Sequence, residues 1–206
     1  MKNKLTLLFA TIAWFAVLTQ YYLMIENRVF SVLETTIRFF SFFTILTNLL
    51  VALYFTLSLV KKKEGYLSIL NKSGTLTAVT VYITVVGLVY QILLRHIWEP
   101  KGMQRVVDEL LHSVIPILVI IFWYLYEEKK AIAYKQILQW LIYPLIYLIY
   151  ILIRGAFSNF YPYPFVDLVN LGLEQVLINS AGLMLFFICL SAVYIKLGKL
   201  MTIHNK

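Results

Sequence analysis

Long apolar segments alternate with short polar stretches over almost the whole chain. Six of these segments are long enough, at about 1.5 Å per helical residue, to cross the roughly 30 Å hydrocarbon core of a bilayer. They are residues 5–25, 38–60, 75–94, 110–126, 137–153 and 175–197. The pattern predicts an all-α polytopic membrane protein, in which residues 1–206 form a single domain of six transmembrane helices.

Polar residues recur inside these segments every three or four positions, so each set lies on one face of a continuous helix. The second segment carries Arg38, Ser41, Thr44 and Asn48. The later segments carry Gly87, Gln91 and Arg95; Arg105, Asp108 or Glu109, and His112; Tyr143, Tyr147, Tyr150 and Arg154; and Gln175, Asn179 and Gly182. Thr44 follows Arg38 by six residues, about 9 Å along a helix, which is similar to the depth expected of His112.

Composition supports the assignment to membrane proteins and argues against several other classes of protein. The chain is 61% hydrophobic and only 14% charged, which is typical of polytopic membrane proteins. Its net charge of +8 does not indicate nucleic acid, because the lysines occupy short loops between apolar segments. The single cysteine, Cys189, and three histidines supply too few ligands for a disulfide, a metal cage or a haem, so no metal and no cofactor is expected.

The first apolar segment is predicted to be a helix of the mature protein. It is long enough to span a membrane and lacks the small-residue cleavage site of a signal peptide.

The distribution of cations predicts the orientation. The N-terminus, residues 61–72, residues 127–135 and the tail from residue 196 hold 12 of the 18 lysines and arginines. By the positive-inside rule both termini are cytoplasmic, in a multi-pass protein of the cell membrane. The polar stripes then fall in the outer half of the membrane. Hydrogen bonds that only join helices would not favour one leaflet, so this placement favours a functional pocket open to the outer side.

His112 is the residue with the clearest chemical potential. An imidazole near the start of a membrane helix needs a partner or a function, and Asp108 and Glu109 precede it by one turn on the same face. Either carboxylate could hold one ring nitrogen. The alternative is that His112 only bonds a neighbouring helix. A hydroxyl at Ser41, Thr44 or Thr47, together with this imidazole, has the composition of an acyl-transfer site.

Three stretches resemble known families. They are residues 38–49 (RFFSFFTILTNL), residues 112–116 (HSVIP) and residues 154–165, which begin Arg-Gly and end Tyr-Pro-Tyr-Pro-Phe. Nearly the whole chain resembles a bacterial six-span membrane family of unassigned function. The short motifs and the span count also resemble the animal androgen-induced/ADTRP-type proteins, which are intramembrane threonine hydrolases of fatty acid esters of hydroxy fatty acids.

The resemblance implies that Thr44 is the nucleophile, that His112 is the base and that the element at Tyr163 rims the pocket. Two positions depart from the animal pattern. Thr47 stands where that pattern has an acidic residue, and the animal spacing from the histidine to the proline is one residue longer than that from His112 to Pro116.

The sequence therefore predicts a hydrolase of lipid-like esters, with membrane lipid and a lipid-like small molecule as partners and no nucleic acid. Asp108 or Glu109 would orient the base. The expected substrate-binding residues are Arg38, Asn48, Gln91, Arg95, Arg154, Tyr163 and Asn179. A second interpretation is a non-catalytic transporter or binding protein for an anionic lipid or small molecule, held by arginines. A third is an assembly or scaffold protein that uses its aromatic faces.

Overall fold

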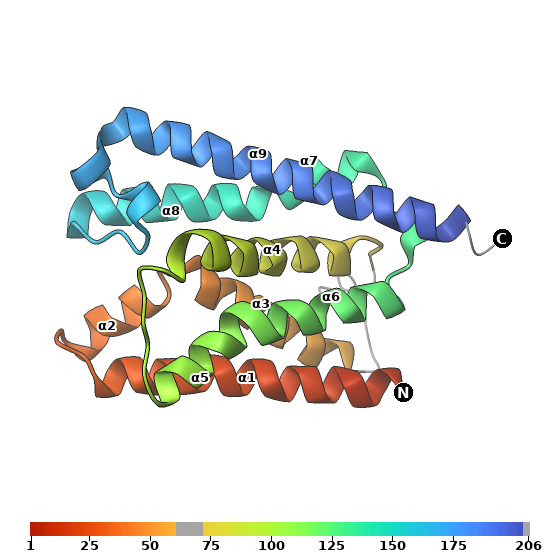
Figure 1. Cartoon of the computed structure of the whole chain (residues 1–206), viewed down its shortest axis with the longest axis horizontal. Helices are drawn as coiled ribbons and strands as arrows, with labels where there is room; N and C mark the ends of the chain where they lie inside the picture. Colours follow the sequence, from red (N-terminus) through yellow and green to blue (C-terminus); the bar gives the residue numbers. More distant parts are fainter. Residues whose placement is uncertain (61–71, 204–206) are drawn as a thin grey trace. The chain divides into compact units, whose positions relative to one another are not determined.

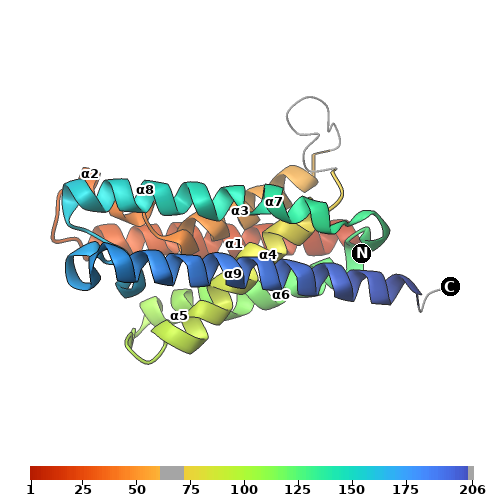
Figure 2. The ribbon, with the colours of Figure 1, turned by 90° about the horizontal axis from the view of Figure 1, so that it is seen from above.

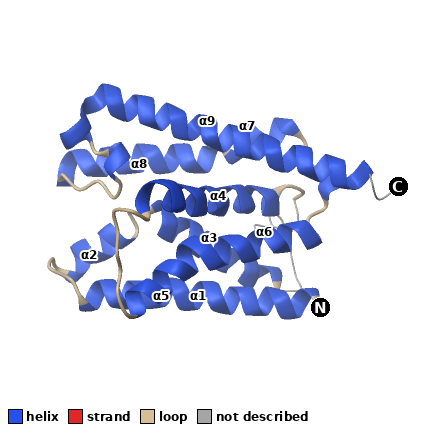
Figure 3. Ribbon diagram, in the orientation of Figure 1, coloured by secondary structure: helices blue, strands red, loops and turns tan. Residues whose placement is uncertain are grey.

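The computed structural model describes residues 1–60 and 72–203, and throughout this part of the chain every regular element is helical (Figure 3). Five helices are long and apolar enough to cross a membrane, or six if one bent pair counts as a single span. The all-α prediction is confirmed, and the helices are consistent with a multi-pass membrane protein. Most of the lysine-rich loop, residues 61–71, and the last three residues of the tail lie outside the described residues.

Contacts divide the chain into two compact units, Met1–Glu128 and Lys129–Lys206, and each is described by itself. The first unit contains α1 (Lys2–Glu26), α2 (Val32–Phe39), α3 (Phe43–Ser58), α4 (Thr75–Val89), α5 (Met103–Glu109) and α6 (Ile115–Tyr126). A π-helical turn, Tyr90–Leu94, continues α4, and another, Leu110–Val114, joins α5 to α6. The second unit contains α7 (Ile137–Trp140), α8 (Ile142–Ser158) and α9 (Leu168–Ile203).

An aromatic cluster forms the core of the first unit. Phe9, Phe55 and Phe122 come from α1, α3 and α6, and their rings meet edge to face with centroids 4.9–5.9 Å apart. This is the arrangement that ring quadrupoles favour. The side chains of Ala13 and Ala16 are fully buried, and such small residues let membrane helices approach closely. The cluster therefore ties three helices into one body.

The helices of the first unit run alternately up and down, so the unit has two distinct ends. At one end the Lys2 ammonium lies 5.5 Å from the centroid of the Tyr126 ring. At the opposite end Gln104 donates a hydrogen bond of 2.7 Å to Gln20. The turn into α2 and the loop before α5 both lie at this second end (Figure 1). It is also the end that carries the polar side chains described below.

The predicted second span is broken. The axes of α2 and α3 differ by 74°, and Phe42 between them has an extended backbone (φ −84°, ψ 125°). The Ser41 hydroxyl donates to the carbonyl of Ile37 at 2.7 Å, which satisfies one of the acceptors left open where a helix ends. Arg38 therefore belongs to α2, whereas Thr44 belongs to α3. The predicted continuous stripe and its 9 Å depth estimate were wrong.

The last three predicted spans are longer than expected, whereas the third has the predicted bounds. Helical segments cover Met103–Tyr126, Tyr134–Ser158 and Leu168–Thr202. Pro116 sits in the first turn of α6, directly after a π-helical turn. The last helix starts seven residues earlier than predicted and changes direction at Gly172, whose φ of +74° suits glycine.

In the second unit α8 and α9 run side by side and antiparallel (Figure 2). The turn that joins them is held on both helices. The ring of Tyr161 lies directly over Gly155, so that a β-carbon there would lie only 2.0 Å from the ring. Asn179 on α9 donates a 2.9 Å hydrogen bond to the carbonyl of Phe165. These contacts fix the loop that contains the Tyr-Pro-Tyr-Pro-Phe sequence.

Candidate functional site

Two π-helical turns face each other at the polar end of the first unit. The Arg95 amide donates to the Tyr90 carbonyl at 2.8 Å, and the Ile115 amide donates to the Leu110 carbonyl. Both bonds span five residues instead of four. Pro116 has no N–H to donate to the carbonyl of His112, four residues earlier, which favours a local change of helical pitch. Single π-helical turns inside α-helices occur frequently at functional sites.

Gly87 brings these two helices together. A β-carbon at this position would lie 3.2 Å from the carbonyl oxygen of His112 and 3.3 Å from the Cβ of Pro116. Both distances are tighter than ordinary packing, so a larger residue would push α4 away. Glycine thus allows α4 to pass over the carbonyl that Pro116 leaves without its helical partner.

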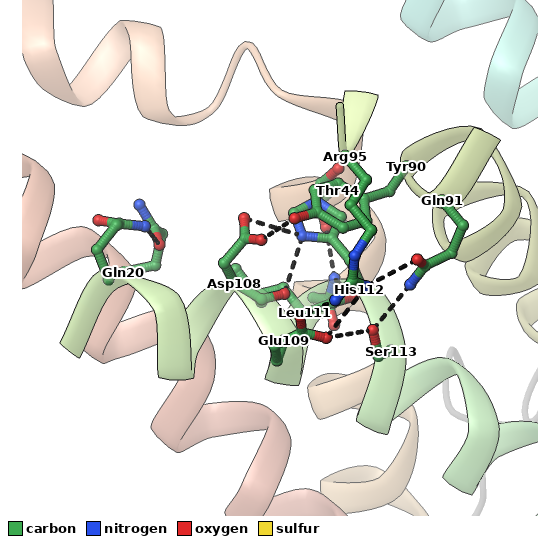
Figure 4. A network of polar contacts seen from close by, with 12 residues as sticks. Gln20, Thr44, Tyr90, Gln91, Arg95, Asp108, Glu109, Leu111, His112 and Ser113 are labelled. Atoms are coloured by element: carbon green, nitrogen blue, oxygen red, sulfur yellow. Dashed lines mark hydrogen bonds and ion pairs between the residues drawn. The ribbon is translucent and has the colours of Figure 1, made fainter. Parts of the chain in front are cut away.

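Asp108 holds His112 and Tyr90 together (Figure 4). The Tyr90 hydroxyl donates to Oδ2 of Asp108, whereas the Nδ1 atom of His112 lies 3.3 Å from Oδ1 and 3.0 Å from the backbone carbonyl of the same aspartate. The tyrosine and histidine rings stack with centroids 4.0 Å apart and planes 14° from parallel. Because both groups near Nδ1 are acceptors, the proton of a neutral ring belongs on Nδ1, and Nε2 becomes the basic atom.

Glu109, the other candidate to orient His112, takes part in a different network. It forms an ion pair of 2.5 Å with Arg95 and accepts a 2.7 Å hydrogen bond from Ser113. Gln91 completes this hydrogen-bond network, because it accepts a bond of 2.7 Å from Arg95 and donates one of 2.9 Å to Ser113. The charge of Arg95 is therefore paired with that of Glu109, and the carboxylate that contacts the histidine is that of Asp108.

Asn48 joins the start of α3 to the π-helical turn that carries His112. Its Nδ2 donates to the carbonyls of Thr44 at 2.9 Å and Leu111 at 3.2 Å, and the residue is fully buried. The first turn of α3 is thus fixed next to the residue that precedes His112. Within the described part of the chain, no hydrogen bond joins the Thr44 hydroxyl to the imidazole.

Arg38 is held locally on α2. Its Nε atom lies 2.7 Å from a carboxylate oxygen of Glu34, four residues earlier, and its guanidinium carbon lies 3.7 Å from the centroid of the Phe30 ring. The ion pair and the ring contact keep the side chain beside its own helix. The bend between α2 and α3 also removes it from the helix that carries Thr44.

Three predicted binding residues belong to the second unit and are described within it. Arg154 donates to the Ser158 hydroxyl at 2.8 Å, and its guanidinium lies 5.0 Å from the centroid of the Phe160 ring. Tyr163 stacks on Phe165 with ring centroids 5.2 Å apart. Asn179 binds the carbonyl of that same phenylalanine. Tyr163 and Asn179 therefore help to hold the loop in place.

A second acid, which is half-buried, lies at the opposite end of the first unit. Glu127 directly follows α6 and accepts a 3.4 Å hydrogen bond from the Gly74 amide, at the residue that precedes α4. Burial raises the pKa of the Glu127 carboxyl, while hydrogen bonds from Thr77 and Gly74 act in the other direction. This acid lies far along the helices from His112, since α6 separates them.

Sequence reasoning missed Tyr90 and Ser113. The spacing rule picked residues four apart, which singled out Gln91 and His112, because it assumed an uninterrupted α-helix. A π-helical turn adds one residue per turn, so the neighbours of the predicted residues also face the site. Pro116 after the histidine was the available signal. Among the described residues, no group of three or more histidine, cysteine, aspartate or glutamate side chains is arranged to hold a metal ion.

Comparisons of the chain with protein-family models, with curated proteins and with solved structures gave no match.

Proposed function

We propose that this protein is an intramembrane hydrolase of lipid-like esters, with His112 as the general base and Thr44 as the nucleophile. The arrangement around the imidazole is the observation that carries the proposal. Asp108 holds Nδ1, and within the described residues no hydrogen bond occupies Nε2. A histidine oriented by a carboxylate at one nitrogen, with the other directed to a hydroxyl, is the base of many acyl-transfer enzymes.

The proposed reaction has two steps. In the first, the Thr44 oxygen attacks the ester carbonyl while its proton passes to Nε2 of His112, and the same proton then leaves with the alcohol. An acyl-threonine remains. In the second step His112 takes a proton from water, the hydroxide attacks the acyl group, and the proton returns to the threonine oxygen. The products are a carboxylic acid and an alcohol, and no cofactor is required.

Thr44 is preferred over the two neighbouring hydroxyls because of their surroundings. Ser41 lies between helices, and its hydroxyl donates to the carbonyl of Ile37. Thr47 is fully buried, whereas Thr44 keeps a small exposed area in the first turn of α3. Asn48 brings that turn to the residue before His112. In structures without substrate, a catalytic contact is often loose and tightens only when substrate binds.

The internal pairing of two arginines disfavours the alternative of a protein that only binds or transports an anion. Arg38 pairs with Glu34 and Arg95 with Glu109. Each guanidinium already shares its charge with a carboxylate, which weakens its attraction for an anionic head group. We therefore propose hydrolysis, with an ester of the fatty acid–hydroxy fatty acid type as substrate.

The proposal includes a topology. Six spans, with α3 forming the second, and cytoplasmic termini would place the Tyr90–Asp108–His112 cluster toward the outer leaflet of the cell membrane. The pocket would then receive substrate from that leaflet and from the outer aqueous phase.

Covalent trapping tests the nucleophile. A fluorophosphonate probe loses fluoride when an activated hydroxyl attacks its phosphorus. Treatment of the purified, reconstituted protein should add the probe to the peptide that contains Thr44, as located by mass spectrometry. Thr44→Ala and His112→Ala should abolish labelling, whereas the matched variant Thr47→Ala, one turn along the same helix, should retain it. Labelling that persists in Thr44→Ala would contradict the assignment.

A further inference from the structure

The exposed face of α2 is apolar. Leu33, Ile37 and Phe40 are spaced by four and three residues, so they share one face of the helix, and all three are exposed; Leu33 is 72% exposed. Val29 and Phe30, in the turn before the helix, are exposed as well. A face of this kind is unfavourable in water, because exposed apolar surface carries a free-energy cost.

The opposite face of α2 packs on α1. Phe39 is only 2% exposed and meets the ring of Tyr21 edge to face at 5.0 Å. The Tyr21 hydroxyl also shares a 2.9 Å hydrogen bond with the Thr36 hydroxyl. These contacts hold α2 in a defined orientation, with its apolar face directed away from α1.

The length and direction of α2 exclude a membrane span of its own. Eight residues reach only about 12 Å, whereas the sixteen residues of α3 reach about 24 Å, most of the roughly 30 Å hydrocarbon thickness. The axes of the two helices differ by 74°. If α3 crosses the membrane, α2 lies closer to the membrane plane than to its normal, near one surface.

The polar residues on the flank of α2 suit that position. Glu34 and Arg38 form an ion pair beside the apolar face, and the Arg38 guanidinium lies over the ring of Phe30. A helix with one apolar face and charges beside it lies in the interface, with its apolar side buried about 5–10 Å into the boundary between head groups and acyl chains.

We infer that α2, with Val29 and Phe30, is an interfacial helix whose apolar face is covered by the lipids of one leaflet. This inference does not depend on the proposed hydrolase activity. It also assigns a depth to the start of α3, because only residues 40–42 separate the two helices. Thr44 then lies close to the level of the head groups.

Site-directed spin labelling of the full chain tests the inference. Cys189 is the only cysteine and is exposed, so a Cys189→Ser background accepts single cysteines at exposed positions without disturbing the core. Leu33→Cys and Ile37→Cys report on the apolar face of α2. Lys101→Cys, in the exposed loop before α5, is the reference for water, and Ile121→Cys, exposed on α6, is the reference for a span. The nitroxide-labelled proteins are reconstituted in phosphatidylcholine vesicles.

Collision rates with oxygen, which concentrates in lipid, and with a water-soluble nickel complex give the depth of each label. Labels at residues 33 and 37 should both be more accessible to oxygen than to nickel and should share one depth, about 5–10 Å below the head groups. Three results would overturn the inference: nickel accessibility like that of Lys101, protection from both reagents through a protein cover, or a depth difference of about 6 Å, as four residues of a straight span would give.

Discussion

At the scale of single residues, the candidate site is held together by Asp108. Its side chain has two partners, which come from two different helices. One carboxylate oxygen accepts from Tyr90 and the other lies near His112. The rings of those two partners stack on each other, so their polar atoms reach the same carboxylate. Both partners lie on π-helical turns, so the position of the proposed base depends on two local departures from α-helical geometry.

Tyr90→Phe tests this dependence. The substitution keeps the ring that stacks on His112 but removes the hydrogen bond to Asp108. We expect kcat to fall by roughly tenfold with little change in KM, since a hydrogen bond to a charged group contributes about 1.5–3 kcal/mol and part of it orients the base. Tyr124→Phe, at an exposed position of α6, is the matched control and should leave kcat unchanged. A Tyr90→Phe enzyme with the parent kcat would show that Tyr90 has only a packing role.

The sequence identified His112, Thr44 and Asn48 because polar residues in an apolar helix are conspicuous. It could not choose between Asp108 and Glu109, which lie on the same helical face and differ only in what the neighbouring helix offers. Arg95 on that helix pairs with Glu109, and Tyr90 pairs with Asp108. Selection between the two carboxylates is therefore a tertiary effect, which spacing alone does not encode.

At the scale of elements, the loop after α8 depends on a glycine. A β-carbon at Gly155 would lie 2.0 Å from the ring of Tyr161, so the loop would have to move. We expect Gly155→Ala to lower the free energy of unfolding by about 1–3 kcal/mol, the usual range for overpacking. Thermal unfolding in detergent measures it.

Gly182→Ala on α9 is the matched control, because nothing lies within 4 Å of its added β-carbon. Alanine there should leave stability unchanged or raise it by up to roughly 1 kcal/mol, through its higher helix propensity. Equal effects of the two substitutions would contradict the close contact between Gly155 and Tyr161.

Glu127 predicts a pH dependence of stability. Burial raises the pKa of this carboxyl in the folded protein above its unfolded value. The folded chain therefore holds its proton more tightly, and stability falls as pH rises from the unfolded pKa through the folded pKa. Glu127→Gln removes this contribution. The stability of the variant minus that of the parent should rise with pH across this window and then level off.

Unfolding midpoints of Glu127→Gln and the parent, measured over about pH 4–8, give this difference. Glu128→Gln, at the exposed neighbouring position, serves as the control for the loss of one carboxylate charge. A difference that stays constant or falls with pH would contradict a raised pKa at Glu127.

Element prediction was best where apolar length dominates and weakest where hydrogen bonds end a helix. The start of α1 and the run 75–94 follow directly from hydropathy. The break after α2 has no proline and no glycine to announce it. At the break, the Ser41 hydroxyl donates to the carbonyl of Ile37. Serines inside membrane helices commonly make the same bond without ending the helix, so the serine alone does not predict a break.

At the scale of the whole molecule, the candidate residues are divided between two compact units. Thr44, Asp108 and His112 belong to Met1–Glu128, whereas Arg154 and Tyr163 belong to Lys129–Lys206. The fold class followed from composition, because a chain this apolar can satisfy its backbone in lipid only through helices or a closed barrel. The division into units did not follow, since hydropathy gives the length of a helix and not its neighbours.

Arg154→Lys tests whether the second unit binds the substrate. The planar guanidinium binds a carboxylate through two parallel hydrogen bonds, which an ammonium group does not reproduce. If Arg154 contacts the free carboxylate of the substrate, lysine should raise KM for a carboxylated ester roughly tenfold or more, with a much smaller effect on the methyl ester of the same compound. Equal changes in KM for both compounds would assign Arg154 a structural role, with Ser158 and Phe160 as its partners.

The central claim is that Thr44 and His112 act as one catalytic pair, and a double-mutant cycle of ester hydrolysis tests it most directly. The parent, Thr44→Ala, His112→Ala and the double variant are compared by kcat in vesicles, with folding checked by thermal unfolding. Residues that act as a unit are strongly non-additive, so the two single variants and the double variant should lose the same activity. Thr44→Ser should retain turnover, because its hydroxyl remains. Additive losses, or hydrolysis at the parent rate in Thr44→Ala, would contradict the account.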